Sequence, residues 1–300
     1  MNGIINVLKP PAMSSSDVVF HIRRITGIKK AGHTGTLDPG AAGVLPVCLG
    51  RATKLADYLM NGAKEYIAEL TLGAATDTLD SYGRVVKTAP ANVTSGEIER
   101  ILPEFLGETM QAPPAYSAAK HHGQPLYKLA RKGIEIEKPA RLVRIEGIDL
   151  LDGERNRFLL RVRCTKGTYI RTLLADLAER LGVPGYTSFL LRSESGGFTL
   201  ASAHTFDEIE TCAAAGELPR VVIPAEEAVG FMKTLHLPQY LYDIVLSGTP
   251  VDLLRANLPE LEKEMDYAIF CRGELIGIGR RRDMQLKVVS MFKIKNVDQS

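Results

Sequence analysis

The sequence has few cysteines, little excess charge and no long apolar run, and each absence argues against a class of protein. Its four cysteines, Cys48, Cys164, Cys212 and Cys271, are widely spaced and form no CxxC pair, so neither a zinc ribbon nor a disulfide framework is indicated. The six histidines include no HExxH pattern, which argues against a zinc hydrolase. This use of cysteine fits a reducing compartment.

No stretch approaches the about 20 consecutive apolar residues that a membrane-spanning helix needs. The first residues also lack a basic segment followed by an apolar one. We therefore expect a soluble, cytoplasmic protein.

The composition is that of a folded protein, because 300 residues at 45% hydrophobic bury a substantial core. The net charge of only +2 gives no global sign of nucleic-acid binding. Basic residues are instead concentrated locally: residues 161–171 carry four without an acid, and residues 280–295 carry six against Asp283 alone. Both runs are candidate phosphate-binding patches, and a solvated strand face is the alternative.

Residue spacing predicts several elements. Ser14 to Asp17 can cap a helix that ends near Gly27, and Thr94 with Glu97 forms a capping box for a second helix. Alternating apolar residues predict strands over 66–72 and 158–164, and helical spacing follows over 173–181. Short alternating runs at 268–271 and 275–278 predict a hairpin.

The most informative segment is Gly32-His33-Thr34-Gly35-Thr36-Leu37-Asp38-Pro39. Its two glycines permit backbone angles closed to other residues and Pro39 fixes the exit, so the Asp38 carboxylate is aimed. An Asx turn that caps a helix is the alternative. The glycine spacing at 27–32 matches a P-loop, but His33-Thr34 stands where a lysine and a hydroxyl residue are required, which argues against a nucleotidase.

Three further motifs accompany this loop: Lys9-Pro10, Lys64-Glu65-Tyr66 and the run from Cys164 to Arg171. Together the four segments resemble the motifs of the bacterial tRNA pseudouridine synthases of the TruB family, which isomerise the T-loop uridine, position 55 of tRNA. The resemblance covers nearly the whole chain in order and spacing.

The resemblance implies an α+β protein with the pseudouridine synthase fold, in which helices flank a mixed, mainly antiparallel central sheet. It also implies two domains. Residues 1–230 form the catalytic domain, with 111–141 as a thumb-like RNA-binding insertion, and residues 231–300 form a small PUA-like β-barrel domain that binds RNA.

Isomerising uridine breaks the C1′–N1 bond, turns the uracil over and joins C5 to C1′, with no change in oxidation state. Such chemistry needs neither a cofactor nor a metal. The resemblance makes Asp38 the group that attacks C1′ or removes a proton from C2′, and these options stay open. Arg171 keeps Asp38 charged, and Tyr66 stacks on the base and accepts or relays the C5 proton. A surface ion pair and a core tyrosine are the structural alternatives.

Five further residues are assigned to RNA. The resemblance implies that His33 stacks where the flipped base was, that Lys9 steadies the floor of the site and that Asp80 contacts the RNA loop. Arg141 and Lys166 are candidates to meet phosphates. A hydrogen-bonded structural histidine and solvated surface charges are the alternatives. We expect the tRNA T-arm as partner, no obligate protein partner, and a monomer.

The rival function is a non-catalytic RNA-binding or RNA-folding module. Asp38 argues against it, because a pure binder has no reason to place an anion where RNA phosphates approach. Help with tRNA folding is a secondary prediction.

Overall fold

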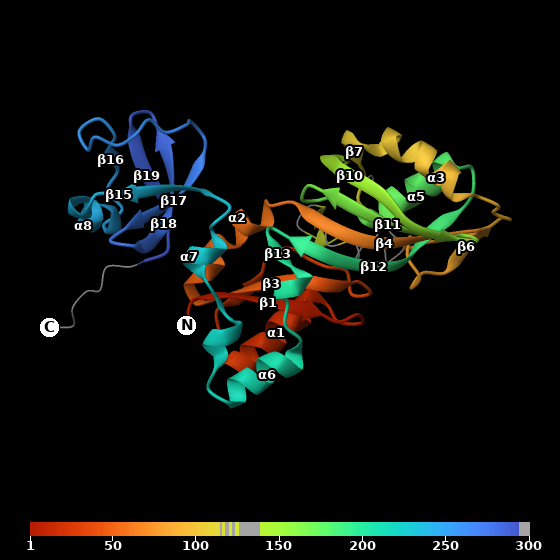
Figure 1. The fold of residues 1–300 in the computed structure, drawn as a ribbon, viewed down its shortest axis with the longest axis horizontal. Coiled ribbons are helices and arrows are strands. Elements are labelled where there is room, and N and C mark those ends of the chain that lie inside the picture. Colours follow the sequence, from red (N-terminus) through yellow and green to blue (C-terminus); the bar gives the residue numbers. More distant parts are fainter. Residues whose placement is uncertain (115, 118–119, 122–123, 126–138, 294–300) are drawn as a thin grey trace.

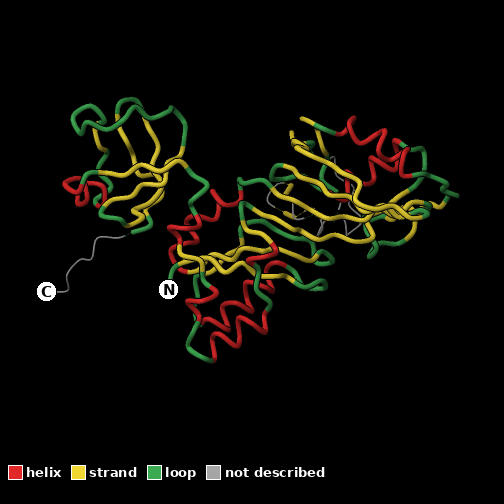
Figure 2. The backbone as a smooth tube through the Cα atoms, in the orientation of Figure 1, coloured by secondary structure: helices red, strands yellow, loops and turns green. Residues whose placement is uncertain are grey.

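The computed structural model describes residues 1–293 apart from 115, 118–119, 122–123 and 126–138 (Figure 1). The first of its two large sheets runs through the centre of the molecule (Figure 2). Its strands are β1 (Gly3–Lys9), β2 (Ala31–His33), β3 (Ala42–Leu49), β4 (Lys64–Leu72), β7 (Gly107–Gln111), β10 (Arg141–Glu154), β11 (Arg157–Cys164), β12 (Gly185–Ser195), β13 (Phe198–Thr199) and β14 (Ile223–Pro224).

The strand order is β14-β1-β3-β12-β4-β11-β10-β7, with β2 beside β3 and β13 beside β12. Within the described part of this sheet, only the pairing of β12 with β3 is parallel. Two short hairpins, β5 (Ala74–Thr76) with β6 (Val85–Thr88) and β8 (Lys120–His121) with β9 (Gln124–Pro125), lie outside it.

Helices cover the sheet in two groups. The described helices are α1 (Ser15–Thr26), α2 (Ala56–Met60), α3 (Ser95–Ile101), α5 (Ile170–Arg180), α6 (Phe206–Ala214), α7 (Ala225–Ala228) and α8 (Tyr242–Leu246). One cluster of buried side chains joins α1 and α6 to β1 and β3, and another joins α3 and α5 to β4, β10 and β11. Among the described residues, none of the helices has the length and apolarity that crossing a membrane requires.

The strands β1 and β3 are buried on both faces, which explains their nearly continuous apolar sequences. Ile5 and Val47 face α1, whereas Ile4 and Cys48 lie in a separate cluster on the opposite face. By contrast, β4 alternates strictly between buried and half-buried residues, because only one of its faces is covered. Tyr66 is therefore on the covered face.

The second sheet is formed by the C-terminal strands β15 (Lys233–Leu237), β16 (Val251–Asp252), β17 (Asp266–Cys271), β18 (Glu274–Arg282) and β19 (Gln285–Met291). Their order is β15-β17-β18-β19-β16. This sheet has a core of its own. It also shares a cluster with the first sheet, in which Leu275 and Phe292 lie with Leu55 and Leu59 of the segment that ends in α2.

The predicted fold class is confirmed: the protein is α+β, with a mixed, mainly antiparallel sheet and a small C-terminal β domain. The two capped helices are also confirmed, since Ser14 and Thr94 each form a capping box. The domain boundary at residue 230 stays a prediction. Most of the thumb-like insertion predicted at 111–141 lies outside the described residues.

The two basic runs do not form continuous positive patches. Arg163 lies on the outer face of β11 between Glu146 and Glu194. In the second run, Arg280 pairs with Asp266, and Lys293 pairs with Glu274. Acids from neighbouring strands thus neutralise much of each run.

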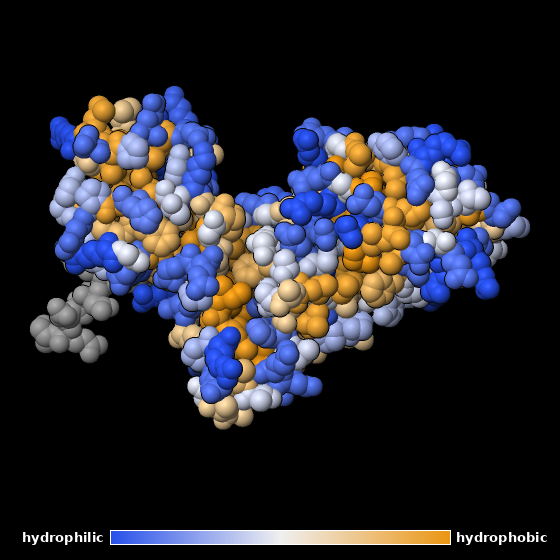
Figure 3. Space-filling model, in the orientation of Figure 1, coloured by the Kyte–Doolittle hydropathy of each residue, from blue (hydrophilic) through white to orange (hydrophobic). Residues whose placement is uncertain are grey.

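In Figure 3 apolar surface gathers over the lobe that carries β10. Leu142 of β10 and Met110 of β7 are cross-strand partners there, and both are exposed.

Candidate active site

The loop that carries Asp38 joins β2 to β3 and is fixed at several points. Ser15, at the start of α1, accepts a hydrogen bond from the Leu37 N–H (2.8 Å) and donates one to its carbonyl (3.0 Å). Gly35 has φ +140°, a conformation that favours glycine. The Asp38 carbonyl accepts from the Ala41 N–H at 3.1 Å. The loop is therefore held, and Asp38 has a defined direction.

Lys9 supports the same loop from below. Its side chain is 0% exposed, and its Nζ donates to the carbonyls of Pro10 (2.7 Å), Pro39 (3.2 Å) and Ala41 (2.6 Å). Burial lowers the pKa of Lys9 to about 8, although the Asp38 carboxylate acts in the opposite direction. The buried ammonium thus connects the end of β1 to the Pro39 and Ala41 carbonyls of the Asp38 loop.

Arg171 connects Asp38 to Asp80. Its Nε lies 2.8 Å from Asp38 Oδ2, and its Nη1 lies 3.2 Å from Asp80 Oδ2. The same guanidinium donates to the carbonyls of Thr78 (2.8 Å) and Tyr116 (2.9 Å). Arg171 is the second residue of α5, where the helix dipole disfavours a cation, and the two carboxylates offset that cost.

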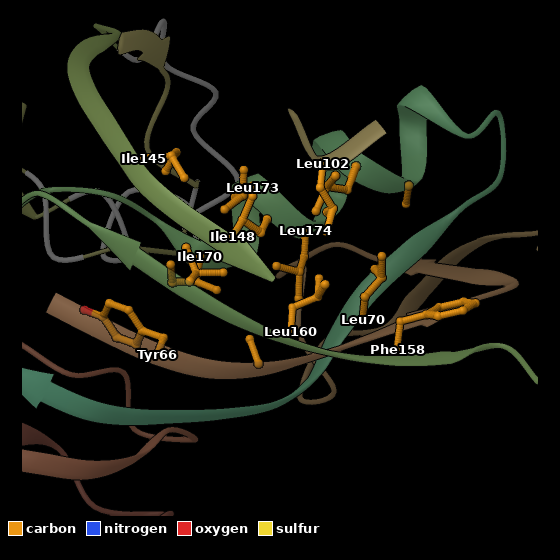
Figure 4. Close-up of a cluster of buried hydrophobic side chains, with 14 of the residues drawn as sticks. Tyr66, Leu70, Leu102, Ile145, Ile148, Phe158, Leu160, Ile170, Leu173 and Leu174 are labelled. Atoms are coloured by element: carbon orange, nitrogen blue, oxygen red, sulfur yellow. The ribbon is translucent and has the colours of Figure 1, made fainter. Parts of the chain in front are cut away.

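Asp38 and Arg171 line a cavity of about 610 Å³, a size typical of a ligand site. Tyr66, Lys64 and Arg192 also line it, as do Arg141 and Lys166 near the surface. In Figure 4 the Tyr66 ring packs at one end of the apolar cluster, and its hydroxyl points away from the other side chains drawn.

Comparisons with known proteins identify the fold and the family. Residues 23–170 match the family model described as TruB family pseudouridylate synthase, N-terminal domain. The tRNA pseudouridine synthase B of Geobacillus thermodenitrificans is 46% identical over 274 residues, which cover 89% of each chain. The chain belongs to the TruB family of pseudouridylate synthases.

Further relatives agree with this TruB assignment. The protein of the same name from Bacillus subtilis is 42% identical and covers 88% of this chain and 86% of its own. Among solved structures, a chain of a Cbf5-Nop10-Gar1 complex superposes with a TM-score of 0.78 at 27% identity, covering 97% of this chain and 85% of that one. The predicted family is therefore confirmed.

The catalytic residues predicted for this TruB-family chain, Asp38, Tyr66 and Arg171, line one cavity, although they lie on three separate segments. Burial raises the pKa of Asp38, the Arg171 cation opposes that shift, and the Asp80 carboxylate adds to it. The Asp38 side chain is still 36% exposed, so a substrate has access to the carboxylate.

The residues assigned to RNA are spread around this TruB site. Asp80 accepts a hydrogen bond from Thr78 Oγ1 at 2.6 Å and also pairs with Arg171. Asp80 therefore helps to hold the arginine that contacts Asp38. Arg141 is exposed on the cavity wall. Lys166 donates to Asn61 Oδ1 at 2.5 Å. Lys9 donates to the Pro39 and Ala41 carbonyls of the Asp38 loop, and its role in the site stays a prediction.

His33 ends β2 and is half-buried, and its Nδ1 accepts from the Gly35 N–H at 3.3 Å. Burial and the nearby Arg192 lower the pKa of His33, which favours the neutral ring. It is not among the described residues that line the cavity, so its stacking role stays a prediction.

The sequence analysis assigned no role in the site to Arg192 or Lys64, although both line the cavity. Lys64 is buried and donates to the carbonyls of Met60 and Gly62. Arg192 is 1% exposed and donates to the carbonyls of Val44 (2.8 Å) and Gly35 (3.2 Å). A signal was present in the sequence, since Arg192 follows Phe189, Leu190 and Leu191 in an apolar strand, where charges are rare.

Proposed function

We propose that this chain isomerises the T-loop uridine at position 55 of tRNA to pseudouridine. The observation that carries the proposal is the ion pair of Asp38 with Arg171 at a cavity that Tyr66 also lines. The names of the relatives, tRNA pseudouridine synthase B, support tRNA as the substrate.

In this proposal the target nucleotide is flipped out of its loop and enters the cavity of about 610 Å³. Asp38 acts on the ribose, either at C1′ or at the C2′ proton. Arg171 keeps the carboxylate ionised against its raised pKa, and this needs the short contact of 2.8 Å. Tyr66 holds the uracil against its ring and takes the C5 proton.

The remaining contacts are assigned by their positions. Arg141 and Lys166 stand at the cavity wall, where basic side chains can meet phosphates of the T-arm. Asp80 and Lys9 hold the parts that act on the substrate, and His33 takes the space left by the flipped base. The C-terminal domain adds RNA contacts, and the enzyme acts as a monomer without a protein partner.

The test uses a T-arm stem-loop labelled with tritium at uridine C5. Wild type is expected to release tritium to water because C5 exchanges its hydrogen for C1′, and Asp38→Asn is expected to release none. Asp149→Asn, which changes an exposed aspartate on β10, is the matched control and keeps the wild-type rate.

Equal release by wild type and Asp38→Asn would refute the role of Asp38. No release by wild type from an RNA that it binds would instead favour the non-catalytic RNA-binding module. The tRNA-folding activity stays a prediction, which the Asp38→Asn protein can test without interference from catalysis.

A further inference from the structure

Arg192 is a buried cation without a carboxylate partner in the described part of the chain. It lies on β12 with 1% of its surface exposed, and its described hydrogen bonds go to the Val44 and Gly35 carbonyls. Placing a charge in such a position is costly when neutral groups alone surround it. A glutamine could donate to carbonyls without that cost, so the charge itself requires an explanation.

The contacts of Arg192 place it between the Asp38 loop and Tyr66. Gly35 belongs to that loop, and Tyr66 is the direct cross-strand neighbour of Arg192 between β4 and β12. Both side chains line the same cavity, and the Arg192 cation lowers the pKa of the Tyr66 hydroxyl. Arg192 is therefore the side chain that links the base-facing tyrosine to the loop of the catalytic carboxylate.

The charges around Tyr66 are predominantly positive. The cavity lining includes the basic residues Lys64, Arg141, Lys166, Arg171 and Arg192, and Asp38 is the one acid among the described lining residues. Arg171 pairs with Asp38, which leaves Arg192 and Lys64 on the Tyr66 side without an anion among the described residues. Such an arrangement suits a negative charge that exists only during the reaction.

We propose that Arg192 is a positioning residue for Tyr66, which holds the hydroxyl toward the base and stabilises its ionised form. The proposal rests on the function proposed above. Once C5 has bonded to C1′, the ring holds an N1–C6 double bond. The C5–H bond then breaks, its electron pair forms the C5–C6 double bond, the N1–C6 π pair moves to N1, and the Tyr66 phenolate takes the proton. N1 takes a proton from water, and the phenol returns its own proton to water before the next turnover, so the isomerisation balances.

Burial raises the pKa of Tyr66, and Arg192 lowers it through both charge and hydrogen bonding. Replacing Arg192 by a neutral residue therefore raises that pKa further, and less phenolate is present at any given pH. Proton removal from C5 becomes slower, whereas RNA binding is expected to be unaffected because Arg192 is only 1% exposed.

The experiment compares single-turnover rates on T-arm stem-loops that carry hydrogen or deuterium at uridine C5. Arg192→Gln is expected to react about 10- to 100-fold more slowly, a loss at the lower end of what a positioned acid–base group contributes. We also expect a larger deuterium isotope effect, a rise of the rate with pH that is displaced to higher pH, and an unchanged Kd for RNA. Arg192→Lys keeps the charge and recovers part of the rate.

Arg157→Gln is the matched control, since this arginine is on the outer face of β11, 65% exposed and paired with Glu69. Melting temperatures are measured for each variant, and Arg192→Lys serves alone if Arg192→Gln fails to fold. Any of three results would overturn the proposal. The first is an unchanged rate, the second is a slower rate with the isotope effect and the pH profile unchanged, and the third is a loss of RNA affinity alone. Wild type without activity on the stem-loop would instead refute the proposed function.

Discussion

Replacing Lys9 by methionine tests how the Asp38 loop is held. The variant keeps the length of the side chain but removes the ammonium that serves three carbonyls. A hydrogen bond from a charged donor contributes about 1.5–3 kcal/mol, so the loss is about 4.5–9 kcal/mol for the three, toward the lower end because only the bond to Ala41 is buried. Part of this loss in the free energy of unfolding is offset, because the variant no longer buries a charge. The pKa of Lys9 falls from 10.5 to about 8, which is worth about 3 kcal/mol.

We therefore expect a net loss of about 3 kcal/mol at pH 7, and a melting temperature lower by about 5–10 °C. The pH dependence gives a second test. Folded wild type binds fewer protons than the unfolded chain between pH 8 and 10.5, so its stability relative to Lys9→Met increases with pH in that window. The positive Lys9 lowers the pKa of Asp38, so its removal shifts the acidic limb of the rate profile to higher pH.

The assays are thermal unfolding from pH 6 to 10 and tritium release from pH 5 to 8. Lys29→Met, at an exposed lysine in the loop after α1, is the control that alters charge without removing a buried donor. A Lys9→Met protein that melts like wild type and keeps its acidic limb would refute the role given to Lys9.

Three further predictions concern the same site and its scaffold. Arg171→Lys keeps the charge, but a lysine cannot reach both carboxylates (Asp38 and Asp80) and both carbonyls at once. The reaction rate should therefore fall about 10- to 100-fold while the Kd for RNA stays unchanged. A variant that reacts at the wild-type rate would contradict this prediction. Asp80→Asn removes the anion that raises the pKa of Asp38, so the acidic limb of the rate profile should shift to lower pH while the loosened Arg171 slows the reaction. A shift to higher pH would show that the sign is wrong. Ser14→Ala removes the cap of α1 and should cost about 1 kcal/mol of stability, seen as a lower melting temperature with unchanged tritium release.

Local signals in the sequence predicted much of the fold. The capping residues Ser14 and Thr94 act within three residues along the chain, so their effect is readable without the structure. Alternation along β4 likewise places Tyr66 on the buried face. The ion pair of Asp38 with Arg171 is different, because 133 positions (171 − 38) separate the two residues in the sequence. No local signal predicts this contact, and it was expected only from the family resemblance.

What the sequence did not predict depends on contacts between distant segments. The basic run that contains Arg163 looked unpaired because Glu146 and Glu194 come from other strands. Arg192 was missed for a related reason: a single charge in an apolar strand has no motif, and its importance depends on Tyr66 being its neighbour on the adjacent strand β4. Pairing between strands, which decides both cases, is not a local property of the chain.

The apolar cluster shared by Leu275, Phe292, Leu55 and Leu59 has a practical consequence for dissecting this enzyme. A chain that ends before β15 would expose the apolar side chains of Leu55 and Leu59 to water, and we expect such a fragment to aggregate. Weak RNA binding by such a fragment would then report damage to the scaffold rather than missing contacts. Single changes at exposed positions of the C-terminal sheet, such as Arg282 or Lys287, avoid this ambiguity.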